Sequence, residues 1–153
     1  MATEILWALN DVTVDLGESS SSDITVVQGQ PVFIGTDNDS NTGRAVDITD
    51  ISAHAAVGIV RTATADVAYT KGKITVALFP VRIRTDNVAA AALPTAAADN
   101  LVYLNNSGEW CNADGNTAGH AYGSCVKVIA AGTYPATTAI LYELDIKGRM
   151  TIL

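Results

Sequence analysis

The sequence predicts a mainly β protein: a small barrel or sandwich of short strands, with an extended N-terminal arm and at most one short helix. The first observation is the central segment Lys73–Arg84, where Val81 and Ile83 face one way and Arg82 and Arg84 face the other. This two-residue period is typical of a half-buried strand. The second observation is that similar short runs recur along most of the chain, each broken by Gly, Asn, Asp or Pro. Repeated short strands with regular turn signals favour a barrel or sandwich.

Residues 1–24 are predicted to form an arm and its connection to the rest of the chain. An apolar run and an alternating run are followed by the serines Ser19 to Ser22, a composition that favours a mobile connection. Such an arm either packs on its own domain or adds a strand to a neighbour, and the sequence leaves both open. A Trp in an apolar terminal arm is a typical contact anchor. We therefore expect the arm to bind a partner through Ile5, Leu6, Trp7 and Leu9.

Residues 25–144 are predicted to form the β domain, and residues 145–153 a C-terminal tail. Gly58 indicates a bulge or a close approach within its strand, and Asn105–Gly108 indicates a hairpin turn. The alanine-rich segment Asn87–Leu93, ended by Pro94, predicts one short helix or an irregular crossover. The expected strands are Ile24–Val27, Pro31–Ile34, Val57–Val60, Val67–Tyr69, Lys73–Arg84, Leu101–Leu104, Glu109–Cys111, Tyr122–Ile129 and Thr138–Leu144.

Composition limits the classes of function. The 153 residues fit one domain. Of them 48% are hydrophobic but only 6% are aromatic, so the core contains few large side chains. Association with other copies would therefore add stability. The net charge of −7 argues against nucleic-acid binding, which needs a basic face. No apolar run reaches the roughly 20 residues that cross a bilayer. The N-terminus also lacks a secretory signal pattern, so we expect no membrane partner.

Two loops contain candidate metal ligands. In Asp37–Gly43 the oxygen ligands alternate as in a calcium loop, but the sixth and twelfth positions hold Thr42 and Ile48 where an EF-hand needs Gly and Glu. Asp47 and Asp50 are further oxygen donors, and a solvated turn remains the favoured interpretation of the Asp37–Asp50 region.

Cys111, His120 and Cys125 have the atom types of a zinc site, with Asp114 as a possible fourth ligand, but they lack C-x-x-C pairing. The same residues allow a Cys–His nucleophilic site or a disulfide, and we favour two reduced thiols. Nucleophile-elbow and phosphate-loop motifs are absent. We therefore expect no metal, no cofactor and no enzymatic activity.

Several short motifs follow one another over roughly residues 25–144: Val27–Val32, Gly58–Val60, Thr75–Leu78 with Pro80-Val81, Asp99–Leu104, Ala121–Gly123 and Ala139–Leu144. In their order and spacing they resemble the small β-rich capsid decoration, or cement, proteins of tailed bacteriophages. The family's glycine before the Asp of its "D-x-V-Y" strand is Ala98 here, and the Asp37–Asp50 loop is longer than such turns usually are.

This resemblance implies a mechanical function. Copies, most often homotrimers, would be made in the host cytoplasm, sit on the outer surface of the virion and bridge subunits of the major capsid protein. The principal alternative is a carbohydrate- or host-receptor-binding module of a head fibre or tail tip. That alternative needs exposed aromatics beside polar loops, and Trp110 with Asn105, Asn106 and Asn112 is the nearest candidate.

Overall fold

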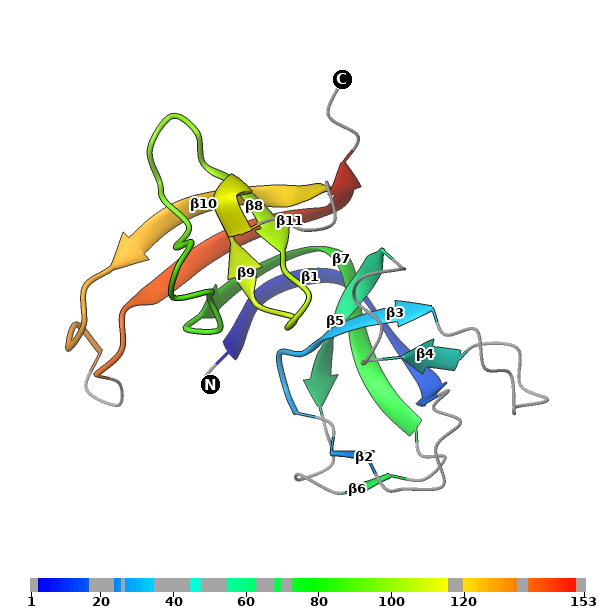
Figure 1. Cartoon of the computed structure of the whole chain (residues 1–153). Helices are drawn as coiled ribbons and strands as arrows, with labels where there is room; N and C mark the ends of the chain where they lie inside the picture. Colours follow the sequence, from blue (N-terminus) through cyan, green and yellow to red (C-terminus); the bar gives the residue numbers. More distant parts are fainter. Residues whose placement is uncertain are drawn as a thin grey trace.

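The computed structural model describes residues 3–16, 24–25, 27–34, 45–47, 55–62, 68–69, 73–115, 120–134 and 138–150. Within these ranges the only helical element is one turn of 3-10 helix, η1 (Ala113–Gly115), so the fold is mainly β, as the sequence predicts (Figure 1). The strands are β1 (Thr3–Leu16), β2 (Ile24–Thr25), β3 (Pro31–Ile34), β4 (Ala45–Asp47), β5 (Ala56–Thr62), β6 (Ala68–Tyr69), β7 (Lys73–Thr85), β8 (Leu101–Leu104), β9 (Trp110–Cys111), β10 (Ala121–Ile129) and β11 (Leu141–Met150).

Strand β7 is the centre of the fold because it pairs along both of its edges. β1 lies antiparallel to β7 for almost its whole length and occupies one edge. β5 and β11 share the other edge, β5 pairing with residues 75–78 and β11 with residues 81–85. Phe79 and Pro80 lie where one partner replaces the other. Pro80 has no backbone N–H that would be left unpaired at this point.

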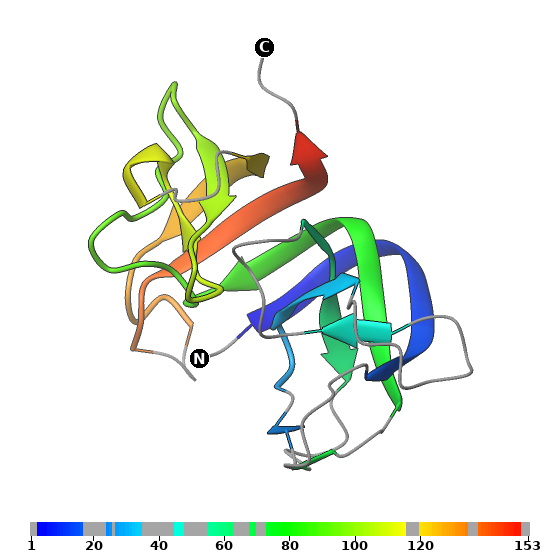
Figure 2. The same cartoon turned by 45° about the vertical axis from the view of Figure 1, so that its right-hand side comes forward.

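The strand pairings form two rolled halves that share β7 (Figures 1 and 2). In the first half β1 pairs with β4, β4 with β3, β3 with β5 and β5 with β7, which pairs back to β1. In the second half the order continues from β7 through β11, β10 and β8 to β9. Val88, just after β7, forms a bridge with Trp110 of β9 and brings this half back to its start. The short β2 and β6 form a separate two-stranded sheet.

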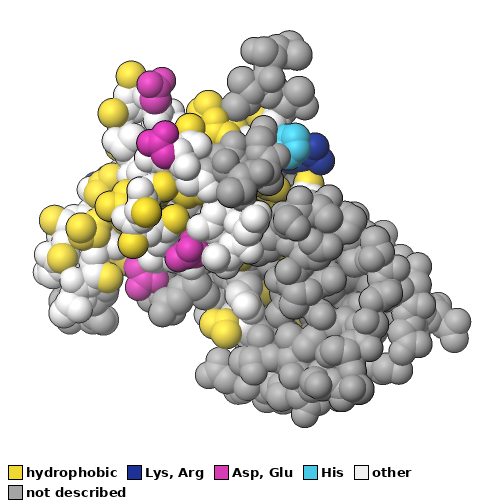
Figure 3. Space-filling model, in the orientation of Figure 1, with side chains coloured by type: hydrophobic (Ala, Val, Ile, Leu, Met, Phe, Trp, Pro, Cys, Tyr) yellow, Lys and Arg dark blue, Asp and Glu magenta, His cyan; other side chains and the backbone are white. Residues whose placement is uncertain are grey.

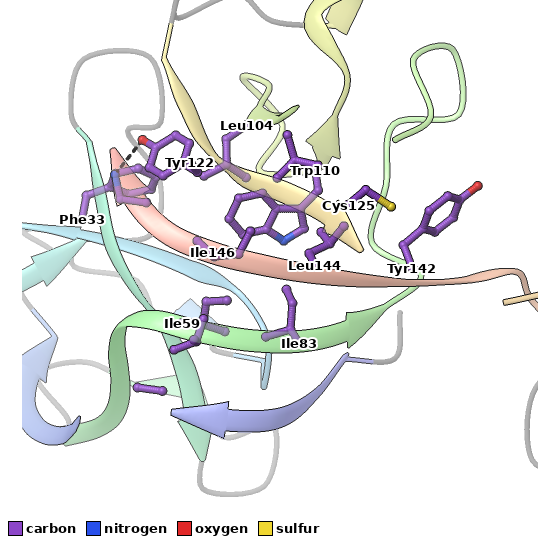
Figure 4. Packing of buried hydrophobic residues seen from close by; sticks show 14 residues of the cluster. Phe33, Ile59, Ile83, Leu104, Trp110, Tyr122, Cys125, Tyr142, Leu144 and Ile146 are labelled. Carbon is purple, nitrogen blue, oxygen red and sulfur yellow. Dashed lines mark hydrogen bonds between the residues drawn. The ribbon is translucent and has the colours of Figure 1, made fainter. Parts of the chain in front are cut away.

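One apolar core runs through both halves (Figure 4). Phe33 and Ile59 enter it from the first half and Trp110 from the second, and all three are fully buried. The ring of Tyr122 packs edge-on against Trp110 with 6.0 Å between ring centroids. The Tyr122 hydroxyl accepts a hydrogen bond of 3.0 Å from the backbone N–H of Ala56, which joins β10 to β5.

The alanine-rich segment after β7 forms an irregular crossover, the second of the two forms expected for it. Its backbone pairs with the chain around β9: Ala89 N–H donates to Trp110 C=O, and Asn112 N–H donates to Ala92 C=O. These bonds use groups that a helix would need for its own ladder. Ala89 and Ala92 are buried and belong to a second small cluster with Tyr103, Cys111 and Ala121.

Two glycines allow neighbouring strands to approach closely. A Cβ on Gly58 would lie 2.5 Å from the carbonyl oxygen of Ala77, which confirms the close approach expected at this position. A Cβ on Gly123 would clash with the carbonyl oxygen of Asp145, in the neighbouring strand β11. Any side chain at either position would push paired backbones apart.

Both ends of the chain belong to the sheet where they are described. β1, predicted as an arm, lies on β7 of its own chain, so the structure takes the first of the two arrangements considered above. β11 continues to Met150, so the tail assigned to residues 145–153 is strand as far as that residue. The reason is that the alternation continues: Ile146 is buried while Lys147 and Arg149 are exposed. The serine connection lies outside the described residues.

Candidate partner-binding surface

The four residues predicted to bind a partner do not face the same way. Ile5 packs against the core, as the inward position in a strand requires. Leu6, Trp7 and Leu9 are exposed, with 36%, 51% and 63% of their surface accessible. We call these three residues the β1 surface. Leu6, Trp7 and Leu9 therefore remain candidates for a contact site, whereas Ile5 packs in the core.

Two irregularities in the pairing of β1 with β7 produce this exposure. Ile5 lies opposite Ile83 and Trp7 lies opposite Arg82, so Leu6 is an extra residue with no partner of its own. A second register shift occurs around Leu9. Bulges of this kind redirect side chains and are often found where a strand edge is used. The sequence pattern shows the apolar residues but not the bulges, which is why it did not separate Ile5 from the others.

The outer edge of β1 is largely unpaired within the described part of the chain. β4 pairs with this edge only at Asp15 and Leu16. No other described strand lies on it. An edge strand with exposed apolar side chains and unpaired backbone groups is able to accept another polypeptide.

Charged side chains form two rows across the outward face of β1, β7 and β11. In the first row Arg84 bonds Glu4 at 3.1 Å and Glu143 at 2.8 Å, and its guanidinium lies 4.6 Å from the ring centre of Tyr134. The hydrogen bond to Glu143 is the main factor that raises the pKa of Arg84. This row fixes β7 against β11 and β1 and leaves no free charge at Arg84.

The second row includes the β1 surface. Trp7 lies opposite Arg82, and Arg82 lies opposite Asp145. The Asp145 carboxylate is 3.5 Å from Arg82 and 3.1 Å from Lys147. Trp7 thus lies at the end of a row in which one carboxylate, Asp145, is shared by two cations, and its exposed ring adds apolar area beside them.

The residues considered for zinc or nucleophilic chemistry do not form a site. Cys111 and Cys125 are buried, are not joined by a disulfide, and belong to different apolar clusters. Burial raises the pKa of both thiols, that of Cys111 to about 11, so neither is a thiolate at neutral pH. His120 instead contacts Arg149, with 2.6 Å between Nε2 and Nη2. Among the described residues no group of three or more His, Cys, Asp or Glu is placed to hold a metal.

The residues named for sugar binding have other uses. Trp110 is fully buried, and no described group bonds its indole Nε1. The Asn105 side chain accepts hydrogen bonds from the N–H groups of Ser107 and Glu109, which shapes the β8–β9 turn. The Asn112 side chain likewise accepts from the N–H of Asp114. Trp110 is therefore a core residue, and it offers no exposed ring to a sugar.

The calcium-type loop lies largely outside the described residues. Ala45–Asp47 forms β4, while Asp37, Asp39, Asn41 and Asp50 are not described.

In the described part of the chain no helix is long and apolar enough to span a membrane. The described surface in Figure 3 shows hydrophobic and acidic side chains over the second half, with basic side chains visible only beside a histidine.

A scan against protein-family models finds no match, and no curated protein matches it either.

Proposed function

We propose that this protein is a structural component of a virion, which binds the outer surface of a tailed-phage capsid and stabilises it by bridging coat subunits as a homotrimer. The order of motifs that resembles capsid decoration proteins supports the proposal, and so does the compact β fold that these motifs build. The acidic charge of −7 suits the outside of a shell, away from packaged DNA.

The observation that carries the proposal is the β1 surface. Leu6, Trp7 and Leu9 are apolar, exposed and close together on an edge strand that already has a full partner on its inner side. Burying a half-exposed side chain of this size contributes about 1 kcal/mol. Burial of all three side chains would therefore stabilise a contact between this strand and a neighbouring subunit in the shell, whether that subunit is coat protein or another copy.

Co-sedimentation with bare capsids tests the proposal. Capsids of tailed phages that lack decoration protein are mixed with the purified chain at micromolar concentration and pelleted. We expect the protein to pellet with the capsids and to raise their resistance to heat or low salt. Absence of the protein from every capsid pellet would contradict the proposal.

Point substitutions are better suited to this assay than truncation, because β1 also covers the core. Leu9→Lys places a charge on the β1 surface and is expected to lower the amount bound at least tenfold. Leu93→Lys is the matched control, since Leu93 is also an exposed leucine, 43% accessible, and lies away from β1 in the crossover after β7.

A further inference from the structure

β1 is less deeply buried than β7, the strand along which it runs (Figure 2). Among residues 3–13 of β1, whose side chains the structure describes, none is buried. In β7, by contrast, Val76, Val81 and Ile83 have no accessible surface. Ile5 and Ala8 of β1 pack against the core, and both are only partly buried. This part of β1 therefore covers the core from outside without adding a buried side chain of its own.

Two register shifts divide the ladder between β1 and β7. One lies around Leu6 and the other around Leu9, which faces Phe79 and Pro80 without a pairing partner in this ladder. Beyond the second shift, residues 10–15 pair with β7 without interruption, and β4 adds its pairs at the end of this stretch. Residues 3–9 are therefore held less continuously than the rest of β1, and we call them the strap.

The part of β7 that pairs with the strap has a second partner. Residues 81–85 pair with the strap along one edge and with β11 along the other. If the strap separated, Arg84 would lose Glu4, whose side chain is 65% exposed, and would keep Glu143 at 2.8 Å. Exposed ion pairs contribute little to stability. The strap can thus leave β7 while β7 stays paired in its sheet.

A pair of hydroxyl groups holds the first residue of the strap. Thr3 Oγ1 lies 2.7 Å from Oγ1 of Thr85, a polar residue that is fully buried. The same Thr85 oxygen accepts a hydrogen bond of 3.0 Å from the backbone N–H of Asn87. The Thr3 side chain also lies against the buried Gly29, where a Cβ would clash with it. Thr3 is therefore in contact with both the β2–β3 turn and the end of β7.

A second threonine pair, further along the same two strands, makes a weaker contact. Thr13 lies opposite Thr75, and their hydroxyl oxygens are 3.5 Å apart in an exposed position. A hydrogen bond of this length that competes with water contributes little to stability. The two pairs have the same chemistry, so they differ only in distance and burial.

We propose that the strap opens as a unit while residues 10–16 and β7 stay in place, and that the contact between Thr3 and Thr85 is its latch. The register shift around Leu9 is the hinge, because the ladder is already interrupted there. Opening carries the β1 surface away from the sheet and exposes one edge of residues 81–85. Segments with few buried contacts have their own, lower free energy of opening. The opening is a property of the single chain and does not depend on capsid binding.

Native-state hydrogen exchange of the full chain, resolved by residue with NMR, tests the opening. The strap amides bonded to β7 are expected to exchange at least about tenfold faster than the β11 amides bonded to residues 81–85. Their exchange is also expected to depend little on urea, because a local opening exposes little surface. Equal rates and an equal urea dependence in the two sets would mean that the strap leaves β7 only on global unfolding, which would overturn the inference.

Thr3→Val tests the latch, because valine has the shape of threonine without its hydroxyl. It is expected to accelerate exchange of the strap amides about five- to tenfold, since the buried Thr85 hydroxyl loses this partner, and to leave β11 unchanged. Thr13→Val is the matched control and is expected to change every rate by less than about twofold. Thr3→Ser keeps the hydroxyl and is expected to stay within about twofold of wild type. Equal effects of the two valine variants, or faster exchange in β11 as well, would contradict the latch.

A cross-link tests the opening without changing Thr3, and it serves equally if Thr3→Val does not fold. Trp7 and Arg82 lie opposite each other with both side chains exposed, so cysteines in their places are within reach of a disulfide. In the oxidised Trp7→Cys, Arg82→Cys chain the strap amides are expected to slow to the rate of β11, and reduction is expected to restore fast exchange. Strap amides that exchange at the same rate in both forms would overturn the inference.

Discussion

Cys111 shows how burial changes the chemistry of a single side chain. Its thiol is fully buried and donates a hydrogen bond to the carbonyl oxygen of Tyr103 at 3.6 Å. Burial, with a smaller contribution from the Glu109 carboxylate, raises its pKa from 9.0 to about 11. Between these pH values the folded chain retains a proton that the unfolded chain loses. The free energy of unfolding therefore falls as pH rises through this window.

We expect urea denaturation to show this fall between pH 9 and pH 11, and Cys111→Ala to reduce it. Since one pKa unit corresponds to about 1.4 kcal/mol, Cys111 contributes at most about 3 kcal/mol of pH-dependent stability. Part of the fall remains in the variant, because burial also raises the pKa values of Cys125, Tyr122 and Tyr142. Identical slopes for wild type and Cys111→Ala over this range would show that the thiol does not titrate as described.

At the scale of the strand, β7 offers a comparison between two arginines two residues apart. Arg84 is 19% exposed and bonds two carboxylates, whereas Arg82 is 44% exposed and approaches Asp145 only to 3.5 Å. We expect Arg84→Ala to lower the free energy of unfolding by about 1.5–3 kcal/mol, because it leaves the largely buried Glu143 carboxylate without its partner. Arg82→Ala is expected to cost less than about 1 kcal/mol. Chemical denaturation of both variants checks the order, and equal losses would contradict it.

The elements predicted from sequence are those defined by local pattern. Alternation identified β7, Pro31 marked the start of β3, and the Asn105–Gly108 cluster marked the β8–β9 turn. Alternation also continues past Leu144 in β11, where the charged residues belong to the segment 145–153 that was predicted as a tail. These charges lie on the outward face of the sheet, where Asp145 pairs with Arg82 and Lys147.

The candidate site was predictable only in part. The apolar composition of Ile5–Leu9 indicated a contact segment, but the bulge that exposes Leu6 and turns Ile5 inward depends on the register with β7. That register is a pairing between distant parts of the chain, and a single sequence does not contain it. The exposure of Val126 and Val128 was missed for the same reason, since both belong to a segment whose pattern otherwise predicts a buried strand.

At the scale of the molecule, the hydrogen bond from Ala56 N–H to the Tyr122 hydroxyl connects the two rolled halves. Tyr122→Phe keeps the ring that packs on Trp110 and removes only the acceptor. We expect it to cost about 1–3 kcal/mol of unfolding free energy, because a buried N–H loses its partner. Tyr134→Phe, whose ring lies over Arg84 on the outer face, serves as control and is expected to change stability by less than about 0.5 kcal/mol. Similar losses in the two variants would mean that the bond between the halves carries no stability.

The shared position of β7 also has a consequence for synthesis on the ribosome. Its first partner, β1, has already emerged when β7 appears, but β11 is translated much later. Until then, the backbone groups of residues 81–85 that pair with β11 have no partner, and side chains such as Ile83 are exposed to solvent. Completion of this fold must therefore wait for the last strand, and crowded polysomes are the place where neighbouring nascent chains would mispair.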